Sequence, residues 1–155
     1  MPLMSANLRY VLSGGAIIAA LTLPAPAHAQ FATPEACVRA LYAFYGTGDN
    51  NLRGFPGDDN ALRKFFVPAL VKLWNEATID VDFFVQGQDF ALSDVTISPA
   101  VVKGDKATVA VAFKNVNEPV RLTYELASGR DGWRISDIRA ADGSTFRQDL
   151  ESSRE

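Results

Sequence analysis

The sequence predicts an α+β domain whose N-terminal helices pack on one face of an antiparallel sheet. Before about residue 77, apolar side chains recur every three to four residues, which is the spacing of one face of a helix. After Ala91 they alternate with polar side chains, as they do along a half-buried strand. Because short turns separate the alternating segments, the strands should form a roughly four-stranded meander. The helices should then cover its apolar face.

The first helix is expected over residues 34–45. Thr33 supplies an N-cap hydroxyl, Pro34 is tolerated in the first turn, and Glu35 places a negative charge at the positive end of the helix dipole. Gly46 can adopt the left-handed conformation that ends a helix. Cys37, the single cysteine, falls on the apolar side of this helix, so we expect a buried and unreactive thiol rather than an intermolecular link.

Two short helices should follow a loop over residues 46–57 that is rich in glycine, asparagine and proline. Their expected ranges are 59–66 and 68–77, with Asp58 or Asp59 as the first cap. Pro68 should break the helical region in two, because proline lacks the backbone N–H and clashes with the preceding turn.

The strands are expected after an irregular stretch. They cover residues 95–97, 107–113, 120–126 and 133–138. A bulge near Asp137 would let Ile138 turn inward. Ser144 is expected to cap a short final helix that holds Phe146 and Leu150.

Residues 1–29 have the features of a signal peptide. Arg9 precedes a charge-free run over residues 10–23, and Ala27-His28-Ala29 resembles a signal peptidase site. A membrane-spanning helix needs about 20 apolar residues, and this run is shorter and ends in prolines. We therefore expect cleavage after Ala29 and a single exported domain over residues 30–155. The mature domain should be periplasmic or secreted, with no stable membrane insertion after cleavage.

Cleavage would remove the only histidine, His28, and leave 126 of the 155 residues. A chain without imidazole lacks the usual base of a Ser or Cys nucleophile and the usual zinc ligands. Loss of Arg9 changes the formal net charge from −3 to −4, with no basic stripe for nucleic acid. The oxygen-rich runs 49–51 and 58–60 lack the spacing of a calcium loop. We assign no catalytic residue, metal or cofactor.

Residues 80–90 form the one chemically distinctive segment, with three carboxylates, three phenylalanines and two glutamines in eleven residues. In one interpretation a phenylalanine wall raises the pKa of a pocket carboxyl and suits it to acid–base work. In the other, which we favour, the phenylalanines cap the core while Gln88 and Asp89 bond to backbone donors of the loop. The candidate binding residues are Asp82, Phe83, Phe84, Gln88, Asp89 and Phe90.

The pieces Asp82-Phe83-Phe84 and Gly87-Gln88-Asp89, with the later run Gly132 to Ile138, resemble a family of small exported bacterial domains of unknown function. The outline is also similar to nuclear-transport-factor-2-like and ketosteroid-isomerase-like cone domains. That resemblance implies a helix-lined pocket against a curved sheet but brings no activity with it.

The preferred hypothesis is an exported, non-catalytic domain that binds a protein or a small apolar ligand. The alternative is an acid–base enzyme that uses Asp82 or Asp89 with a tyrosine. Within the binding class, an inhibitor or immunity role would use the Ser128–Gly132 hairpin tip, which also fits an ordinary turn. The binding and acid–base hypotheses differ on one observation, which is whether residues 83–90 border an open cavity that contains an ionisable group or pack solidly.

Overall fold

The computed structural model describes residues 30–46 and 54–154, so the predicted signal peptide and most of the first loop lie outside the described residues. Helix α1 spans Pro34–Tyr42, and the Thr33 hydroxyl accepts a hydrogen bond from the Ala36 N–H as predicted. It ends three residues before the expected Tyr45, in a turn where the Tyr45 N–H bonds to the Tyr42 carbonyl. Gly46 then takes a φ of 59°, the left-handed stop that the sequence predicts.

The second helical region divides at the expected place, into α2, Asp59–Phe65, and α3, Pro68–Glu76. Asp58 caps α2 by accepting hydrogen bonds from two backbone N–H groups. The extended break has a structural role, because the Val67 N–H donates to the Ile135 carbonyl in the last strand. The break before Pro68 thus ties the helices to the sheet.

The sheet is antiparallel and runs in the order β1-β3-β4-β5, with the short β2 also paired to β3. The strands are β1 Leu92–Ile97, β2 Val101–Lys103, β3 Lys106–Asn115, β4 Glu118–Gly129 and β5 Gly132–Ala140. The predicted α+β class and open meander are confirmed. Strand β2 was missed because its three residues are all exposed and show no alternation.

A bulge in β5 sets which side chains face the core. Leu126 pairs with Ile135, whereas the preceding Glu125 pairs with Asp137, so Ser136 is the extra residue. Ile135 and Ile138 are both buried as a result. This confirms the bulge predicted near Asp137.

The last helix, α4, spans Phe146–Ser152. Its cap is Thr145 and not Ser144 as predicted. The Thr145 hydroxyl accepts from the Gln148 N–H, and the Gln148 side chain accepts from the Thr145 N–H, which completes a capping box. Ser144 instead bonds to Asp142 in the preceding turn.

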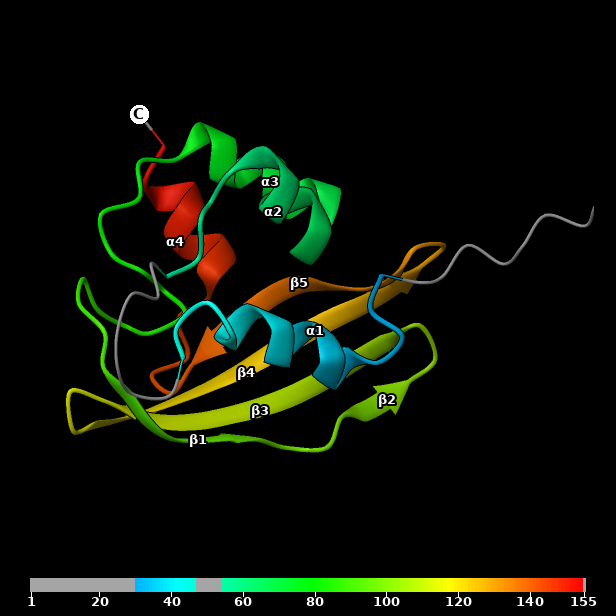
Figure 1. Cartoon of the computed structure of the whole chain (residues 1–155). Coiled ribbons are helices and arrows are strands. Elements are labelled where there is room, and N and C mark those ends of the chain that lie inside the picture. The colour runs from blue at the N-terminus through cyan, green and yellow to red at the C-terminus, as the bar shows by residue number, and fades with distance from the viewer. Residues whose placement is uncertain (1–29, 47–53, 155) are drawn as a thin grey trace, which may run out of the picture.

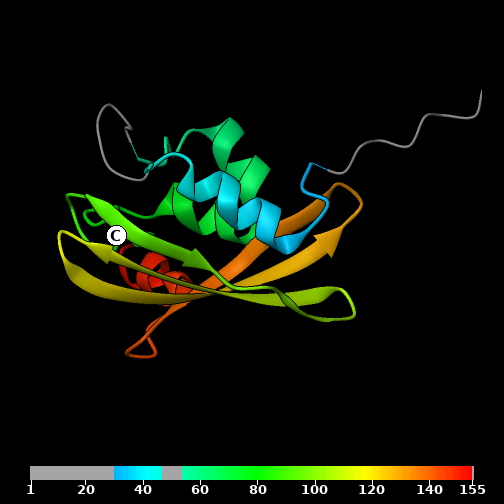
Figure 2. The ribbon, with the colours of Figure 1, turned by 60° about the horizontal axis from the view of Figure 1, so that its bottom comes forward.

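The core lies between the helices and one face of the sheet. Helix α1 crosses that face, while α2, α3 and α4 gather beside β5 (Figure 1). The view in Figure 2 shows the curved sheet with α1, α2 and α3 on one side. The junction between these helices and the sheet is filled by aromatic rings, and residues 80–90 close one end of it.

Candidate functional site

Residues 82–87 fold into a tight turn that belongs to no strand ladder. The Asp82 and Gly87 backbones exchange hydrogen bonds, from the Asp82 N–H to the Gly87 carbonyl and from the Gly87 N–H to the Asp82 carbonyl. Gln86 has a φ of 57°, a conformation that side chains larger than glycine seldom adopt. The turn holds the phenylalanines of this segment at the helix-to-sheet junction.

The Asp82 carboxylate is fixed by two donors. The Phe84 N–H donates to Oδ1 at 2.9 Å, and the Tyr45 hydroxyl donates to Oδ2 at 2.5 Å. Burial raises the pKa of Asp82, although both hydrogen bonds act in the opposite direction. Burial, and then the adjacent carboxylate, also raise the pKa of Tyr45. The pair is held together from two distant parts of the chain.

Two further tyrosines anchor the same turn. Tyr124 donates its hydroxyl hydrogen to the Tyr42 hydroxyl, which in turn donates to the Phe84 carbonyl, each over 3.0 Å. Burial is the main cause that raises the pKa of both tyrosines. The tyrosines therefore act as neutral hydrogen-bond donors at ordinary pH.

Asn115, at the end of β3, satisfies the backbone where residues 85–91 approach the sheet. It accepts from the Ala91 N–H at 2.9 Å and donates to the carbonyls of Val85 and Asp89, each at 3.0 Å. Asn115 is 8% exposed, one of two buried polar residues among those described. From the sequence alone, residues 115–119 lie between two alternating segments and include Pro119, which predicts only a turn at Asn115.

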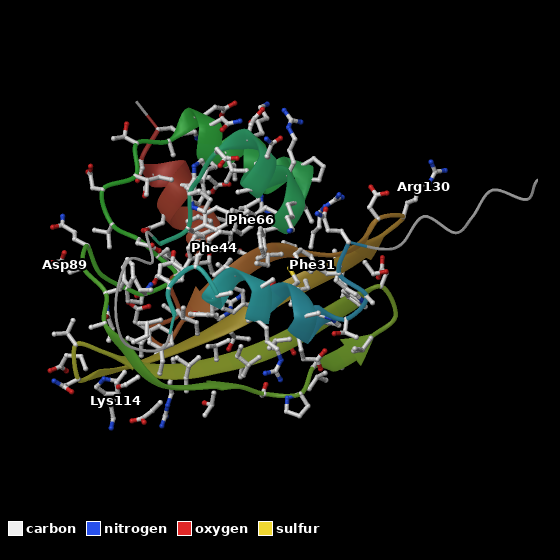
Figure 3. The ribbon with its side chains drawn as sticks, viewed as in Figure 1. Phe31, Phe44, Phe66, Asp89, Lys114 and Arg130 are labelled. Atoms are coloured by element: carbon white, nitrogen blue, oxygen red, sulfur yellow. The ribbon has the colours of Figure 1, made fainter. Side chains whose placement is uncertain are left out.

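Gln88 and Asp89 do not have the structural role predicted for them, and this part of the interpretation is wrong. Both side chains are exposed, and neither forms a hydrogen bond within residues 30–46 and 54–154. Asp89 projects from the margin of the molecule (Figure 3). The backbone bonds assigned to them are made by Asp82 and Asn115, whose side chains point inward.

Aromatic rings form the floor beside this turn. Phe66, Trp74 and Phe84 lie nearly parallel to one another, at interplanar angles of 14° to 28°, with centroids 5.8 to 6.1 Å apart. Phe55 meets all three edge-on. Gly54 and Gly57, at φ values of 72° and 66°, make the turns that bring Phe55 over them, and a Cβ at Gly57 would lie 3.3 Å from the Trp74 ring.

A cavity of about 330 Å³ opens between this floor and the turn. Four of the six predicted residues line it, namely Asp82, Phe83, Phe84 and Gln88. Asp89 and Phe90 do not, and the Phe90 ring packs edge-on against Tyr45 instead. The other polar and aromatic lining residues are Asp80, which lies in the predicted segment but was not named as a binding residue, and Phe55, Trp74 and Phe146, which the sequence missed. In the sequence, Trp74 continues the helical apolar spacing of residues 68–77 and Phe146 falls in the predicted final helix, so the pattern indicated only that both are buried.

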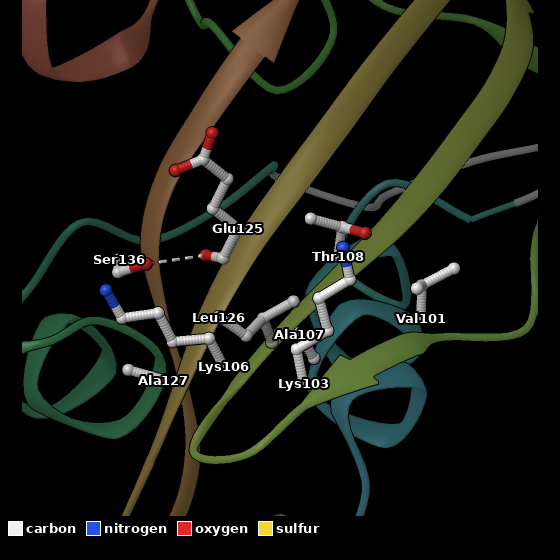
Figure 4. Close-up of a pocket in the computed structure, with 9 residues that line it drawn as sticks. All are labelled: Val101, Lys103, Lys106, Ala107, Thr108, Glu125, Leu126, Ala127 and Ser136. Atoms are coloured by element: carbon white, nitrogen blue, oxygen red, sulfur yellow. Dashed lines mark hydrogen bonds between the residues drawn. The ribbon is translucent and has the colours of Figure 1, made fainter.

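A separate hollow of about 330 Å³ lies on the other face of the sheet, over β3 and β4 (Figure 4). Lys103, Lys106 and Glu125 line it with small side chains, and the Ser136 hydroxyl donates to the Glu125 carbonyl at 3.1 Å. It brings together neither an aromatic wall nor a buried polar group. We therefore place the candidate site at the helix-to-sheet junction.

The hairpin tip between β4 and β5 is exposed at Ser128 to Asp131, and Arg130 projects from it (Figure 3). Its base is held by the N-terminal segment, because the Gln30 N–H donates to the Asp131 carbonyl and the Trp133 N–H donates to the Phe31 carbonyl. Arg134 pairs with Asp131 at 3.5 Å. The hairpin therefore ends in an exposed turn whose base is hydrogen-bonded to the N-terminal segment.

No protein-family model and no curated protein match this chain. Among solved structures, it is similar to a chain of the type VI native effector–immunity complex Tae3-Tai3 from Ralstonia pickettii, with a TM-score of 0.53 and 23% identity over 70% of this chain and 95% of that chain. A phospholipid-binding protein from Ralstonia solanacearum aligns with a TM-score of 0.44 and 19% identity, over 83% of this chain and 84% of that one. The first likeness shows a shared fold. No helix among the described residues is long and apolar enough to cross a membrane.

Proposed function

We propose that this chain is an exported, non-catalytic binding domain that takes an apolar group of a protein partner into the cavity beside residues 80–84. The observation that carries the proposal is the cavity itself. Aromatic residues from four segments that are distant in sequence line it, and one of these segments is the predicted one, residues 80–90. A small apolar ligand is the other occupant that the aromatic walls would accept. Periplasmic or secreted localisation rests on the signal-peptide features of residues 1–29.

The volume of the cavity and the exposed apolar residues around it favour a protein partner over a free ligand. Its volume lies at the lower end of the roughly 300–1,000 Å³ typical of small-molecule pockets, which suits one large side chain. Ile79 and Val81 extend the apolar surface beyond the opening, with 37% and 46% of their surface exposed. An anchor side chain surrounded by an apolar rim is a common arrangement in protein interfaces.

The shared fold with a chain of the Tae3-Tai3 complex supports a protein-binding role, since that complex joins two different proteins. Fold alone does not transfer a partner. The proposal therefore stands on the cavity, and the resemblance to nuclear-transport-factor-2-like domains stays a prediction consistent with a helix-lined pocket beside a curved sheet.

The hydrogen-bonded Asp82 and Tyr45 side chains favour a second candidate function, acid–base catalysis. Both groups have raised pKa values and Asp82 lines the cavity. Against it, both oxygens of the carboxylate already accept hydrogen bonds that hold the turn. Asp82→Asn separates the two functions, because the amide keeps the shape but cannot take up a proton. A binding domain retains its partner after this change.

The test uses the purified domain and each protein encoded beside its gene, titrated by calorimetry. Val81→Ser should weaken binding by about tenfold, the effect of removing an apolar contact from an interface. Val101→Ser is the matched control, because Val101 is 59% exposed but lies in β2, away from the cavity. If Val101→Ser weakens binding and Val81→Ser does not, the site is wrongly placed.

A further inference from the structure

A second hollow adjoins the cavity and lies along α4. The second hollow measures about 120 Å³ and shares four residues with the first, which are Ile79, Asp80, Val81 and Phe146. We call the combined feature the junction groove. It runs from the Trp74 ring past the 79–81 segment to Asp149.

Every charged residue that lines the junction groove is acidic. These residues are Asp80, Asp82 and Asp149. Within the described parts of the chain, none of the three forms a salt bridge, although several other carboxylates do. Both oxygens of Asp82 accept hydrogen bonds within the fold. Asp80 and Asp149 therefore place negative charge without a salt-bridge partner beside apolar walls, which complements a cation.

The walls suit a cation on a hydrocarbon stem. Trp74 is half-buried and lines the groove, and tryptophan is the best aromatic partner for a cation. Exposed Ile79 and Val81 flank Asp80, so an aliphatic stem can lie along them while its charged head reaches the carboxylate. A guanidinium group is planar, stacks on aromatic faces and binds carboxylates through several N–H donors, whereas an ammonium group is more strongly hydrated.

We infer that the junction groove recognises an arginine side chain presented by a protein partner, with Asp80 and the Trp74 ring as the groups that select it. This inference rests on the proposed function and names the chemistry of the group that is bound. The charge of Asp80 provides the selectivity, and the aromatic floor provides the apolar contact.

The test compares N-acetyl-arginine amide with N-acetyl-citrulline amide, which has nearly the same shape but no charge. Each is titrated into the ¹⁵N-labelled domain, and backbone and indole N–H shifts are followed. The arginine compound should shift the signals of residues 79–84 and of the Trp74 indole, and the citrulline compound should bind at least threefold more weakly. Asp80→Asn should weaken binding of the arginine compound by about threefold, the scale of one exposed charge pair.

Asp105→Asn provides the matched control, because it removes the same charge from an exposed turn between β2 and β3. It should leave binding unchanged. Equal binding of both compounds at the groove would overturn the arginine inference but leave the apolar site in place. Shifts confined to other parts of the molecule, with no response of the Trp74 indole to either compound, would contradict the site itself.

Discussion

Asn115 best explains how the segment next to the candidate site is held in place, although an asparagine amide is neither an acid nor a base. One amide joins β3 to three backbone groups of residues 85–91. The sequence correctly predicted that this irregular segment needs polar side chains to satisfy its backbone, but it assigned the task to Gln88 and Asp89. Those residues are adjacent in sequence, whereas Asn115 lies 24 to 30 residues away, and nothing in its local pattern distinguishes it from a turn asparagine.

Replacing Asn115 should therefore cost far more stability than replacing Asp89. Asn115→Ala leaves the Ala91 N–H and two carbonyls without their partner, and we expect a loss of about 3 kcal/mol in the free energy of unfolding. Urea denaturation of the wild type and the variant measures it.

Asp89→Asn is the control and should change the free energy of unfolding by less than about 0.5 kcal/mol, as exposed substitutions usually do. Similar losses for the two variants would show that the exposed carboxylate of Asp89 supports the turn after all.

At the scale of helices and strands, the spacing of apolar residues was sufficient to predict an element wherever that element has one buried face. The two helices around Pro68 and the long strands β3 and β4 follow the predicted alternation of buried and exposed residues. The pattern failed for β2, which has no buried face, and for the end of α1, because Tyr45 is buried although the helix has already ended at Tyr42. Burial, not helical backbone, explains why Tyr45 fits the helical spacing.

The cap of α4 shows how one residue decides where an element begins. Ser144 and Thr145 are both suitable caps, and only the geometry distinguishes them. Thr145→Ala should lower the free energy of unfolding by about 1 kcal/mol, because the Gln148 N–H loses its acceptor and α4 packs on the rest of the fold through Phe146 and Leu150. Thermal denaturation measures the difference.

Ser144→Ala should have a much smaller effect, because its hydroxyl bonds only to exposed Asp142. A larger loss for Ser144→Ala than for Thr145→Ala would mean that the helix begins where the sequence suggested.

At the scale of the whole molecule, the two edges of the sheet differ. Other segments of the chain hydrogen-bond to the β5 edge, whereas the β1 edge is interrupted by a bulge. The β5 edge is covered by the chain near Phe31, by Val67 and by Ser144, each through backbone hydrogen bonds. On the opposite edge β1 is bulged at Asp94, and the Glu35 carboxylate accepts from the Ala100 N–H at 2.6 Å. That hydrogen bond lowers the pKa of Glu35. Such pairings between distant segments are invisible to local patterns, so the sequence did not show which edge is open.

The covered β5 edge gives a prediction about where the domain must begin. A chain that starts at Gln30, the end expected after signal-peptide cleavage, keeps both hydrogen bonds to the hairpin and the buried Phe31 ring, whose centroid lies 5.1 Å from that of Phe65. A chain that starts at Thr33 loses all of these but retains the whole of α1 and its cap. We expect the first to unfold like the full-length chain and the second to be less stable by about 3 kcal/mol, the usual effect of removing a buried phenylalanine. Phe31→Ala in the Gln30 chain separates the ring from the backbone pairing, because it removes the side chain and keeps the hydrogen bonds. Denaturation of the four proteins under identical conditions decides the matter, since equal stability of the chains that begin at Gln30 and Thr33 would show that the N-terminal segment is dispensable for closing the sheet.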